Sequence, residues 1–349
     1  MNVIRRWFRE RIPVSENQIL ELLDEPVPHH LKRWWFCLGG TPAYLFVVQI
    51  ATGILLAFYY QPSATTAYES VRFITHEAAY GWYFRSLHKW AATMMVATVV
   101  LHQMRVYFTG AYRKPREINW MIGMCLLLST LVIGFTGYSL VYEQLSYWGA
   151  TVAANICDMV PVVGGLAKQM LLAGETYNSE TLPRFYILHA AVLPVTMILL
   201  LAIHIGILRM QGVSELQFED EAPGEPRHFP FFPDHLCTEL IIGLVLMIVL
   251  SVLATVLPAG MGPRADPLTT PEVIKPEWFF YATFRWLKLF SGTAAVLSMG
   301  LVVFVMFVWP FIDAWFQRRA RWAEASVWIG IVGVALIVGL TVWEAAVEH

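Results

Sequence analysis

Hydrophobic residues along this chain gather in seven long runs separated by polar or aromatic segments. A helix needs about 20 apolar residues to cross a hydrocarbon core of about 30 Å, and each run is long enough. The strict alternation of a membrane barrel is absent, so the pattern predicts an all-α membrane protein with about seven transmembrane helices. The runs cover Trp34–Tyr60, Arg85–Phe108, Asn119–Tyr142, Pro183–Met210, Leu236–Pro258, Ala294–Phe316 and Ala323–Ala346.

Basic residues mark one side of these runs, and the positive-inside rule makes that side cytoplasmic. The N-terminus is therefore expected inside and the C-terminus outside. The N-terminal sequence MNVIRRWFRERIP lacks the apolar core of a signal peptide, so the mature chain is expected to begin there. The clusters are Arg5, Arg6, Arg9, Arg11, Lys32 and Arg33 before the first run, Arg113, Lys114 and Arg116 before the third, and Arg318, Arg319 and Arg321 before the seventh.

Composition supports a lipid environment. The chain is 57% hydrophobic and 14% charged, with a mean hydropathy of +0.54, which excludes an ordinary soluble protein. A net charge of -2 gives no sign of a nucleic-acid partner. The four cysteines lack CxxC and CxxCH spacing, so neither a disulfide framework nor a two-cysteine haem attachment motif is expected.

The segments between the runs divide the chain. Residues 143–182 and 259–293 are long, aromatic and rich in short helix-like stretches, so surface helices that form a site are expected outside. Residues 212–235, rich in Glu, Asp, Pro and Gly, are predicted to form a cytoplasmic linker. The linker separates a four-helix domain, residues 1–211, from a three-helix C-terminal part, residues 236–349.

Four histidines lie inside predicted spans, where ionisable residues are rare and usually functional. His88 and His102 belong to the second run, and His189 and His204 to the fourth. Separations of 14 and 15 residues keep each pair broadly on one helix face, roughly 21 to 22 Å apart along the axis. Both helices run from outside to inside, so the pairs match in depth. This arrangement suits two stacked haems, each bound by imidazoles from facing helices.

Two further roles are open to histidines inside a membrane. Any one of these four alone is as easily a hydrogen-bonding residue between helices. A proton relay in a transporter is a more specific alternative. Such a relay would not need matched pairs of histidines at two depths, and it usually places carboxylates in the same spans. The two histidine-bearing runs contain none.

Glycines and arginines fit the haem interpretation. Only glycine lets a backbone approach a haem plane closely, although small residues also serve ordinary helix packing. Arginines near the histidine levels suit haem propionates, with interfacial snorkelling as the alternative. The glycines are Gly39 and Gly53, and Gly123 and Gly137, each pair 14 residues apart; the arginines are Arg85, Arg105 and Arg184.

Several long motifs resemble the cytochrome b family of quinol-oxidising complexes, and its cytochrome b6 branch in particular. FCLGGTPAYLFVVQIATGILLAFYYQP resembles the first span of that family, RSLHKWAATMMVATVVLHQMRVYFTGAYRKPRE the second, and LPRFYILHAAVLPVTMILLLAIHIGILRMQG the fourth. The C-terminal part, with FFPDHLCTEL and PEVIKPEWFFYATF, resembles the separate subunit that accompanies cytochrome b6. The spacing of 15 between His189 and His204 is the b6-like value.

The resemblance implies a Q-cycle. Quinol is oxidised near the outer face, one electron passes to a Rieske iron-sulfur protein and then to a c-type cytochrome, and the other crosses two b haems to a quinone near the cytoplasmic face. Protons are released outside and taken up inside. A homodimer in an energy-transducing membrane of the bacterial cytoplasmic type is expected. The rival within haem proteins is a di-haem anchor of a quinone-linked dehydrogenase, which would not need the PEWFF motif or the long outer segments.

The resemblance also assigns site residues. Glu277 of PEWFF is expected to accept a quinol proton, with Trp278 beside it, while Phe279 stands where relatives have Tyr. Glu143 adds an acidic group at the rim of this site. The remaining assignments are Tyr138, Tyr147 and Gly149 in the wall of the outer quinol pocket, and propionate contacts by Arg85 and Arg184 for the outer haem and Arg105 for the inner haem.

Cys37, in WFCLGG, resembles the position at which b6-type members attach a third haem, a haem c, through one thioether. From composition alone this cysteine would be ordinary core packing. The start of the first run lies at about the depth of His102 and His204, so the haem would lie beside the inner b haem. Arg209, just beyond His204, is expected to pair with its propionates or with quinone.

Overall fold

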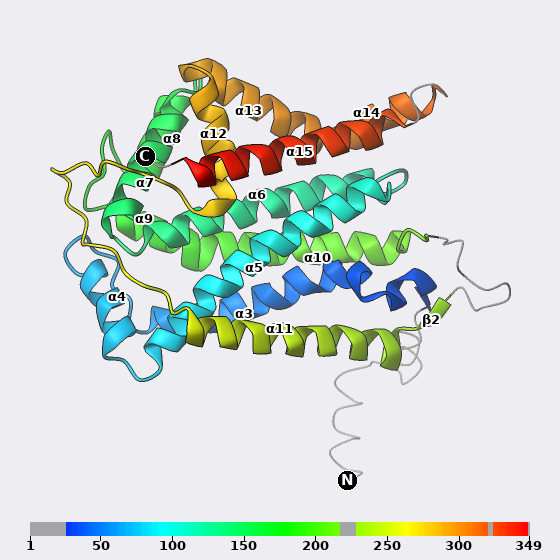
Figure 1. Ribbon diagram of the computed structural model, residues 1–349, viewed down its shortest axis with the longest axis horizontal. Helices are drawn as coiled ribbons and strands as arrows, with labels where there is room; N and C mark the ends of the chain where they lie inside the picture. The colour runs from blue at the N-terminus through cyan, green and yellow to red at the C-terminus, as the bar shows by residue number, and fades with distance from the viewer. Residues whose placement is uncertain (1–25, 217–227, 320–323, 348–349) are drawn as a thin grey trace, which may run out of the picture.

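The computed structural model describes residues 26–216, 228–319 and 324–347. The basic residues Arg5, Arg6, Arg9, Arg11 and Arg321, and residues 217–227 of the expected linker, lie outside this part. Long helices run roughly along the longest axis of the molecule (Figure 1). They are α3 (Gly40–Ala57), α5 (Gly81–Phe108), α6 (Glu117–Ser139), α10 (Leu193–Gln211), α11 (Leu236–Val256), α13 (Gly292–Phe307) and α15 (Ala325–Ala346).

Five helical stretches of the described chain are by themselves long and apolar enough to cross a membrane, and the bent pair α13–α14 makes a sixth. The second predicted span, α5, has 28 residues but carries Arg85, Lys89 and Arg105, which reduce its apolar character. It nevertheless packs along α3, α6 and α11. The count of seven therefore stays a prediction, while a multi-span helical membrane protein is what the structure has. The five are Cys37–Ala57, Glu117–Ser139, Thr181–Gln211, Phe231–Val256 and Ala325–Ala346.

Short helices gather at one end of the molecule, together with the described end of α15 (Figure 1). Helices are present in both segments where surface helices were expected. At the opposite end, β1 (Pro26–Pro28) pairs antiparallel with β2 (His228–Pro230), with Val27 opposite Phe229. The short helices of the first end are α4 (Ala67–His76), α7 (Gln144–Asp158), α8 (Gly164–Leu172), α9 (Thr181–Ile187), η5 (Trp278–Phe280) and α12 (Tyr281–Leu289).

The remaining elements extend or join the long helices. Two 3-10 helices precede α3, and two π-helices precede α10 and α11. Helix α14 continues from α13 after a bend. Their bounds are η1 (His29–Lys32), η2 (Trp34–Gly39), η3 (Leu188–Val192), η4 (Phe231–His235) and α14 (Trp309–Gln317).

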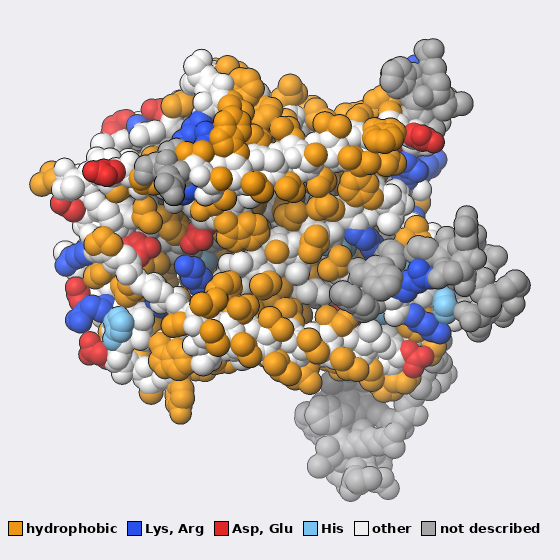
Figure 2. All heavy atoms as spheres, in the orientation of Figure 1, with side chains coloured by type: hydrophobic (Ala, Val, Ile, Leu, Met, Phe, Trp, Pro, Cys, Tyr) orange, Lys and Arg blue, Asp and Glu red, His pale blue; other side chains and the backbone are white. Residues whose placement is uncertain are grey.

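The main core lies where α3, α5 and α11 pack together. Leu45, Leu87 and Leu250, one from each helix, are at most 2% exposed. Outside this core, large apolar side chains on α10, α11, α13 and α15 point away from the protein. Figure 2 shows hydrophobic side chains over the middle of the molecule, with charged side chains mostly toward its two ends. Such a surface matches lipid in the middle and water at both ends.

A buried aspartate joins the bent pair to the rest of the bundle. Helices α13 and α14 meet at 62°, where Pro310 lacks the N–H needed to continue the helix. Asp313, in the first turns after the bend, is fully buried and accepts a hydrogen bond from Arg113 Nε at 2.7 Å. Ser326 and Gln317 also donate to its carboxylate. One carboxylate therefore connects α14 with the α5–α6 loop and the start of α15.

Replacing Arg113 with Gln should destabilise this junction strongly. The change leaves a buried carboxylate without its cation, a loss that typically costs about 3–5 kcal/mol. The thermal unfolding midpoint of the purified protein in detergent should fall clearly. Arg72→Gln is the matched control, because Arg72 and Glu69 form an exposed pair of the kind that contributes about 1 kcal/mol or less. Equal midpoints for the two variants would contradict a supporting role for Asp313.

Candidate functional site

The four membrane histidines lie on α5 and on the continuous helical run formed by η3 and α10. His88 and His102 are on α5, His189 is in η3 and His204 is on α10. Helices α9, η3 and α10 form one continuous run, and the π-turn of η3 precedes Pro194. Proline cannot donate the usual hydrogen bond to the preceding turn, and single π-turns often occur at functional sites. The π-turn before Pro194 thus determines the direction in which the His189 side chain leaves the helix.

The outer pair is close enough to share one metal ion. The ring centroids of His88 and His189 are 6.2 Å apart, with an angle of 71° between the rings. Imidazoles bound to opposite sides of one ion, each with a metal–nitrogen distance of about 2 Å, have centroids about 6 Å apart. The two imidazoles could therefore hold one metal ion, such as the iron of a haem, between them.

Hydrogen bonds select the tautomer of both outer histidines. Thr52 Oγ1 donates to the carbonyl of Val48 and so accepts from His88 Nδ1 at 2.8 Å. His189 Nδ1 donates to the carbonyl of Ile133 at 3.0 Å. With the proton on Nδ1, each ring has its Nε2 lone pair available for a metal.

Each of the four predicted glycines faces one histidine. A Cβ added at Gly39 would lie 3.5 Å from His102 Cε1, one at Gly53 would lie 3.4 Å from His88 Cε1, and one at Gly123 would lie 3.5 Å from His204 Cε1. At Gly137 the contact with His189 Cε1 would be 2.5 Å, closer than two carbon atoms can approach. The glycines therefore let α3 and α6 approach the histidine-bearing helices at the levels of the rings.

The inner pair differs from the outer pair in its hydrogen bonds. His102 Nδ1 is buried and has no hydrogen-bond partner among the described residues. The carbonyl of Asn119 lies near His204, but Nδ1 of His204 also makes no hydrogen bond of good geometry within the described chain. Buried nitrogens without partners are costly, and a bound group that orders both rings would remove part of that cost.

The predicted propionate arginines have different surroundings. Arg85 donates to the carbonyls of Ala259 and Gly260 at 2.7 and 2.9 Å, so it holds the segment after α11. Arg184 is exposed and donates to the Met170 carbonyl. Arg105 lies within electrostatic range of His102 and Cys37, as expected for the inner level.

The structure brings together Tyr138, Gly149 and Glu277, three of the residues predicted for the outer quinol pocket. A Cβ on Gly149 would lie 3.2 Å from the hydroxyl of Tyr138, so α7 packs directly on this phenol. The Tyr138 hydroxyl is buried, and no hydrogen-bond partner for it is present in the described structure. Tyr147 packs against Tyr177 with centroids 4.5 Å apart, and burial raises the pKa of Tyr147, which keeps its hydroxyl protonated. The hydroxyls of Tyr138 and Tyr147 are thus available to donate hydrogen bonds to a ligand oxygen.

The PEWFF segment lies beside Tyr138 and against α6. Glu277 Oε1 lies 3.8 Å from Lys89 Nζ. The Glu277 carboxylate is also within electrostatic range of the Tyr138 hydroxyl. The tip of the Phe279 ring would lie 3.4 Å from a Cβ on Gly134 of α6. A tyrosine hydroxyl would extend from that same ring atom toward the helix, so phenylalanine fits the close approach. Trp278 is more exposed and packs against Phe279.

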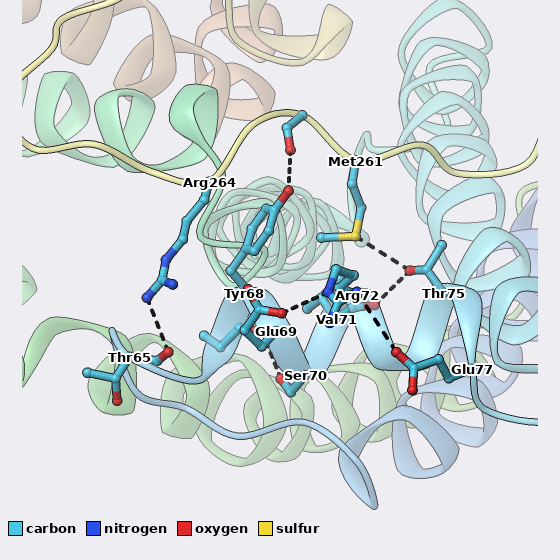
Figure 3. Close-up of polar contacts among 12 residues, drawn as sticks. Thr65, Tyr68, Glu69, Ser70, Val71, Arg72, Thr75, Glu77, Met261 and Arg264 are labelled. Atoms are coloured by element: carbon cyan, nitrogen blue, oxygen red, sulfur yellow. Dashed lines mark hydrogen bonds and ion pairs between the residues drawn. The ribbon is translucent and has the colours of Figure 1, made fainter.

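Helix α4 holds the segment that leads to PEWFF. Figure 3 shows Tyr68, Thr75 and Arg264 among these contacts. Tyr68 donates to the Gly262 carbonyl at 2.9 Å, and Arg264 donates to the Thr65 carbonyl at 3.2 Å. Glu143 caps α7 and accepts the Gly262 N–H at 2.6 Å. The acidic group expected at the rim of the site is therefore engaged by backbone groups.

Cys37 is buried at the other end of the bundle, beside two further metal-ligating side chains. Its thiol donates weakly to the Leu31 carbonyl at 3.5 Å. The ligand atoms of Cys37, His235 and Glu239 all lie within 4.8 Å of one another. Arg209 stacks over Phe231 at 5.1 Å, next to His235.

Sequence reasoning missed several of these residues. Thr52 and Thr136, which lies 3.3 Å from His189 Nδ1, each directly precede an outer glycine. The repeated Thr-Gly pair was a signal that could have shown them. His235 and Glu239 were missed because only the fold brings them to Cys37.

Comparison with known proteins agrees with this geometry. The family described as Cytochrome b/b6/petB matches residues 22–212, and the family described as Cytochrome b(C-terminal)/b6/petD matches residues 264–348. A cytochrome b6 of Heliomicrobium gestii is 44% identical over 210 residues, which are 60% of this chain and 99% of that protein. A cytochrome bc complex cytochrome b subunit of Chlorobaculum thiosulfatiphilum is 34% identical over 347 residues, 98% of this chain and 80% of that protein.

A solved structure supports the fold independently. A chain of a hyperthermophilic respiratory Complex III superimposes with a TM-score of 0.86 at 24% identity, covering 99% of this chain and 92% of that chain. The haem b that the family implies fits the residues present, since paired imidazoles with free Nε2 positions lie opposite glycines. The chain belongs to the cytochrome b/b6 family and is a membrane cytochrome b subunit of a bc-type quinol oxidoreductase complex, with b6-like and petD-like regions in one polypeptide.

Proposed function

We propose that this subunit oxidises quinol at its outer pocket and passes electrons through two b haems to a quinone site at the cytoplasmic end. The observation that carries the proposal is the pairing of four histidines with four glycines at two levels. His88 and His189 would hold the outer haem, and His102 and His204 the inner one. When bound, the haems would supply one-electron transfer between the two sites.

The chain itself supplies binding and proton transfer at the outer pocket. The Tyr138 hydroxyl, buried without a partner among the described residues, is placed to donate to a quinol oxygen. Glu277 would accept the hydroxyl proton that quinol loses, and Lys89 would stabilise its carboxylate between turnovers. Phe279 and Tyr147 would form aromatic walls that exclude water from the quinol ring. Because the outer end is built from long segments with PEWFF, it favours quinol oxidation over a simple dehydrogenase anchor.

The remaining assignments follow from this function. The seven-span arrangement, the cytoplasmic N-terminus and the division into residues 1–211, 212–235 and 236–349 are part of the proposal. The partners would be a Rieske iron-sulfur protein and a c-type cytochrome, in a homodimeric complex that contributes to proton translocation. The C. thiosulfatiphilum relative carries the name of a bc complex subunit, which supports such partners.

A covalent haem at Cys37 would require its buried thiol to change partners. The thiol is 2% exposed and is surrounded by His235, Glu239 and Leu31. A haem there would have to displace these contacts, with Arg105 and Arg209 available for its propionates.

Replacing Gly137 with Ala should lower the content of the outer haem. The added methyl group would lie 2.5 Å from His189 Cε1, so the imidazole must shift from its position opposite His88. Gly300→Ala on α13 is the matched control, because its methyl group would meet no atom within 4 Å. Haem per polypeptide and the α-band of the outer haem in the dithionite-reduced spectrum measure the difference. The same spectrum for both variants and the wild type would count against the glycine–histidine pairing.

Replacing Glu277 with Gln should slow quinol oxidation roughly 100-fold or more without loss of haem, since general-base catalysis typically contributes about 10²–10⁴-fold. Steady-state reduction of the acceptor cytochrome by quinol gives the rate. Glu272→Gln, an exposed glutamate in the same segment, is the control and should retain wild-type turnover. Wild-type turnover in Glu277→Gln would remove Glu277 from the mechanism.

Haem staining of the denatured polypeptide tests Cys37. A thioether-linked haem stays on the chain during gel electrophoresis, whereas b haems dissociate. A stained wild-type band that disappears in Cys37→Ala is the outcome expected for covalent attachment. An unstained wild-type band, with all haem extracted by acid acetone, assigns Cys37 to helix packing.

A further inference from the structure

Glu344 is a buried carboxylate at the end of the bundle that holds PEWFF. It lies in the last turn of α15 and is the single charged residue of that helix. Its side chain is fully buried. A carboxylate at such a position is costly unless it is paired, and ionisable residues in membrane helices mark functional sites by default. The groups around Glu344 therefore indicate its role.

Two cations of α12 bind this carboxylate. Arg285 Nε lies 2.8 Å from Glu344 Oε2, and Lys288 Nζ lies 3.5 Å from Oε1. Arg285 is itself 11% exposed, and its guanidinium stacks over the Trp343 ring, 4.6 Å from the centroid. Residues three apart lie on one face of a helix, so a single turn of α12 presents both cations to one carboxylate. Arg285, Lys288 and Glu344, the Glu344 cluster, thus join α12 to α15.

PEWFF leads directly into α12. Glu277 precedes η5, and α12 begins at Tyr281, immediately after η5. The Phe280 N–H donates to the Glu277 carbonyl at 2.9 Å, which ties the carboxylate's own backbone to this short helix. Helix α12 and η5 pack against α15, whose described end lies beside them (Figure 1). A displacement of α12 would therefore also displace Glu277.

A second contact joins the other flank of PEWFF to the same helix end. Lys275, which directly precedes the motif, donates from Nζ to the Val347 carbonyl at 3.1 Å. Val347 is the C-cap of α15, three residues beyond Glu344. Tyr281, under the Lys275 ammonium, is within electrostatic range of both Glu277 and Glu344. PEWFF is thus attached to the end of α15 both before and after the motif.

We infer that Glu344 is a positioning residue for quinol oxidation: by pairing with Arg285 and Lys288 it determines where α12 lies and so where Glu277 meets the quinol hydroxyl. This inference rests on the function proposed above. Without the carboxylate, two neighbouring cations would repel each other and would need water that the contact with α15 excludes. Helix α12 would then move away from α15. A misplacement of about 1 Å at a reacting group can slow a reaction about 100-fold.

The test compares Glu344→Gln with Glu69→Gln in the purified complex. Glu69 also pairs with an arginine, Arg72, but both are exposed, so its replacement should leave kcat unchanged. Glu344→Gln should lower kcat for quinol oxidation about 100-fold, and Glu344→Asp, which keeps the charge, should restore part of it. Haem content and the reduction potentials of the b haems should stay at wild-type values, because the four histidines lie on α5, η3 and α10.

Amide hydrogen exchange distinguishes local positioning from general destabilisation. In Glu344→Gln the amides of residues 277–289 should exchange faster than in the wild type, while those of α5 and α6 should keep their protection. Combining Glu344→Gln with Arg285→Gln should reduce kcat by less than the product of the two single losses, since both changes disrupt the same ion pair.

Each other result overturns a stated part. A kcat in Glu344→Gln equal to that in Glu69→Gln, or unchanged exchange in residues 277–289, overturns the inference. Faster exchange throughout the long helices assigns Glu344 to general stability and also overturns it. If Glu344→Gln does not assemble, Lys288→Gln decides, because Arg285 still pairs: a lower kcat with faster local exchange supports the inference, and wild-type values overturn it. A wild-type complex that does not oxidise quinol overturns the proposed function itself.

Discussion

Close contact between glycine and histidine is the constraint on which the rest of this bundle depends. Imidazoles inside a membrane need partners for both ring nitrogens, and lipid offers none. Glycines of η2, α3 and α6 let the backbone approach the rings of α5, η3 and α10 closely. At His88 and His189, Thr52 and the Ile133 carbonyl occupy Nδ1, so the lone pair is on Nε2. The glycine–histidine contacts therefore determine how closely these helices approach one another.

The two ends of the molecule use different physical means. At the outer end, α4, α7 and the segment after α11 are joined by hydrogen bonds through Tyr68, Arg85 and Glu143. These bonds fix the approach of PEWFF to α6 and leave the Tyr138 hydroxyl for a ligand. At the other end, titratable and cationic groups gather around Glu239. Hydrogen bonds to the backbone thus order one end, whereas charged and titratable side chains gather at the other.

The juxtaposition of Phe279 and Gly134 explains a departure from the family pattern. The ring tip meets the α6 backbone directly. A hydroxyl at that atom would require a partner or more space in a tightly packed region. The loss of the tyrosine hydroxyl is thus matched by close packing, and the pocket keeps a polar donor in Tyr138.

The sequence by itself determined the helical membrane class, the four histidines and the glycines at the same 14-residue spacing, because hydrophobic length and helical periodicity are local properties. It also located PEWFF and the long outer segments. Only the tertiary structure decided that Arg85 holds the Ala259 and Gly260 carbonyls, that Glu143 caps α7, and that His235 and Glu239 reach Cys37. Except for the Glu143 cap, which is local, each of these contacts joins segments that are far apart in the sequence and are not related by any periodic pattern. Their partners depend on how helices from distant parts of the chain pack together.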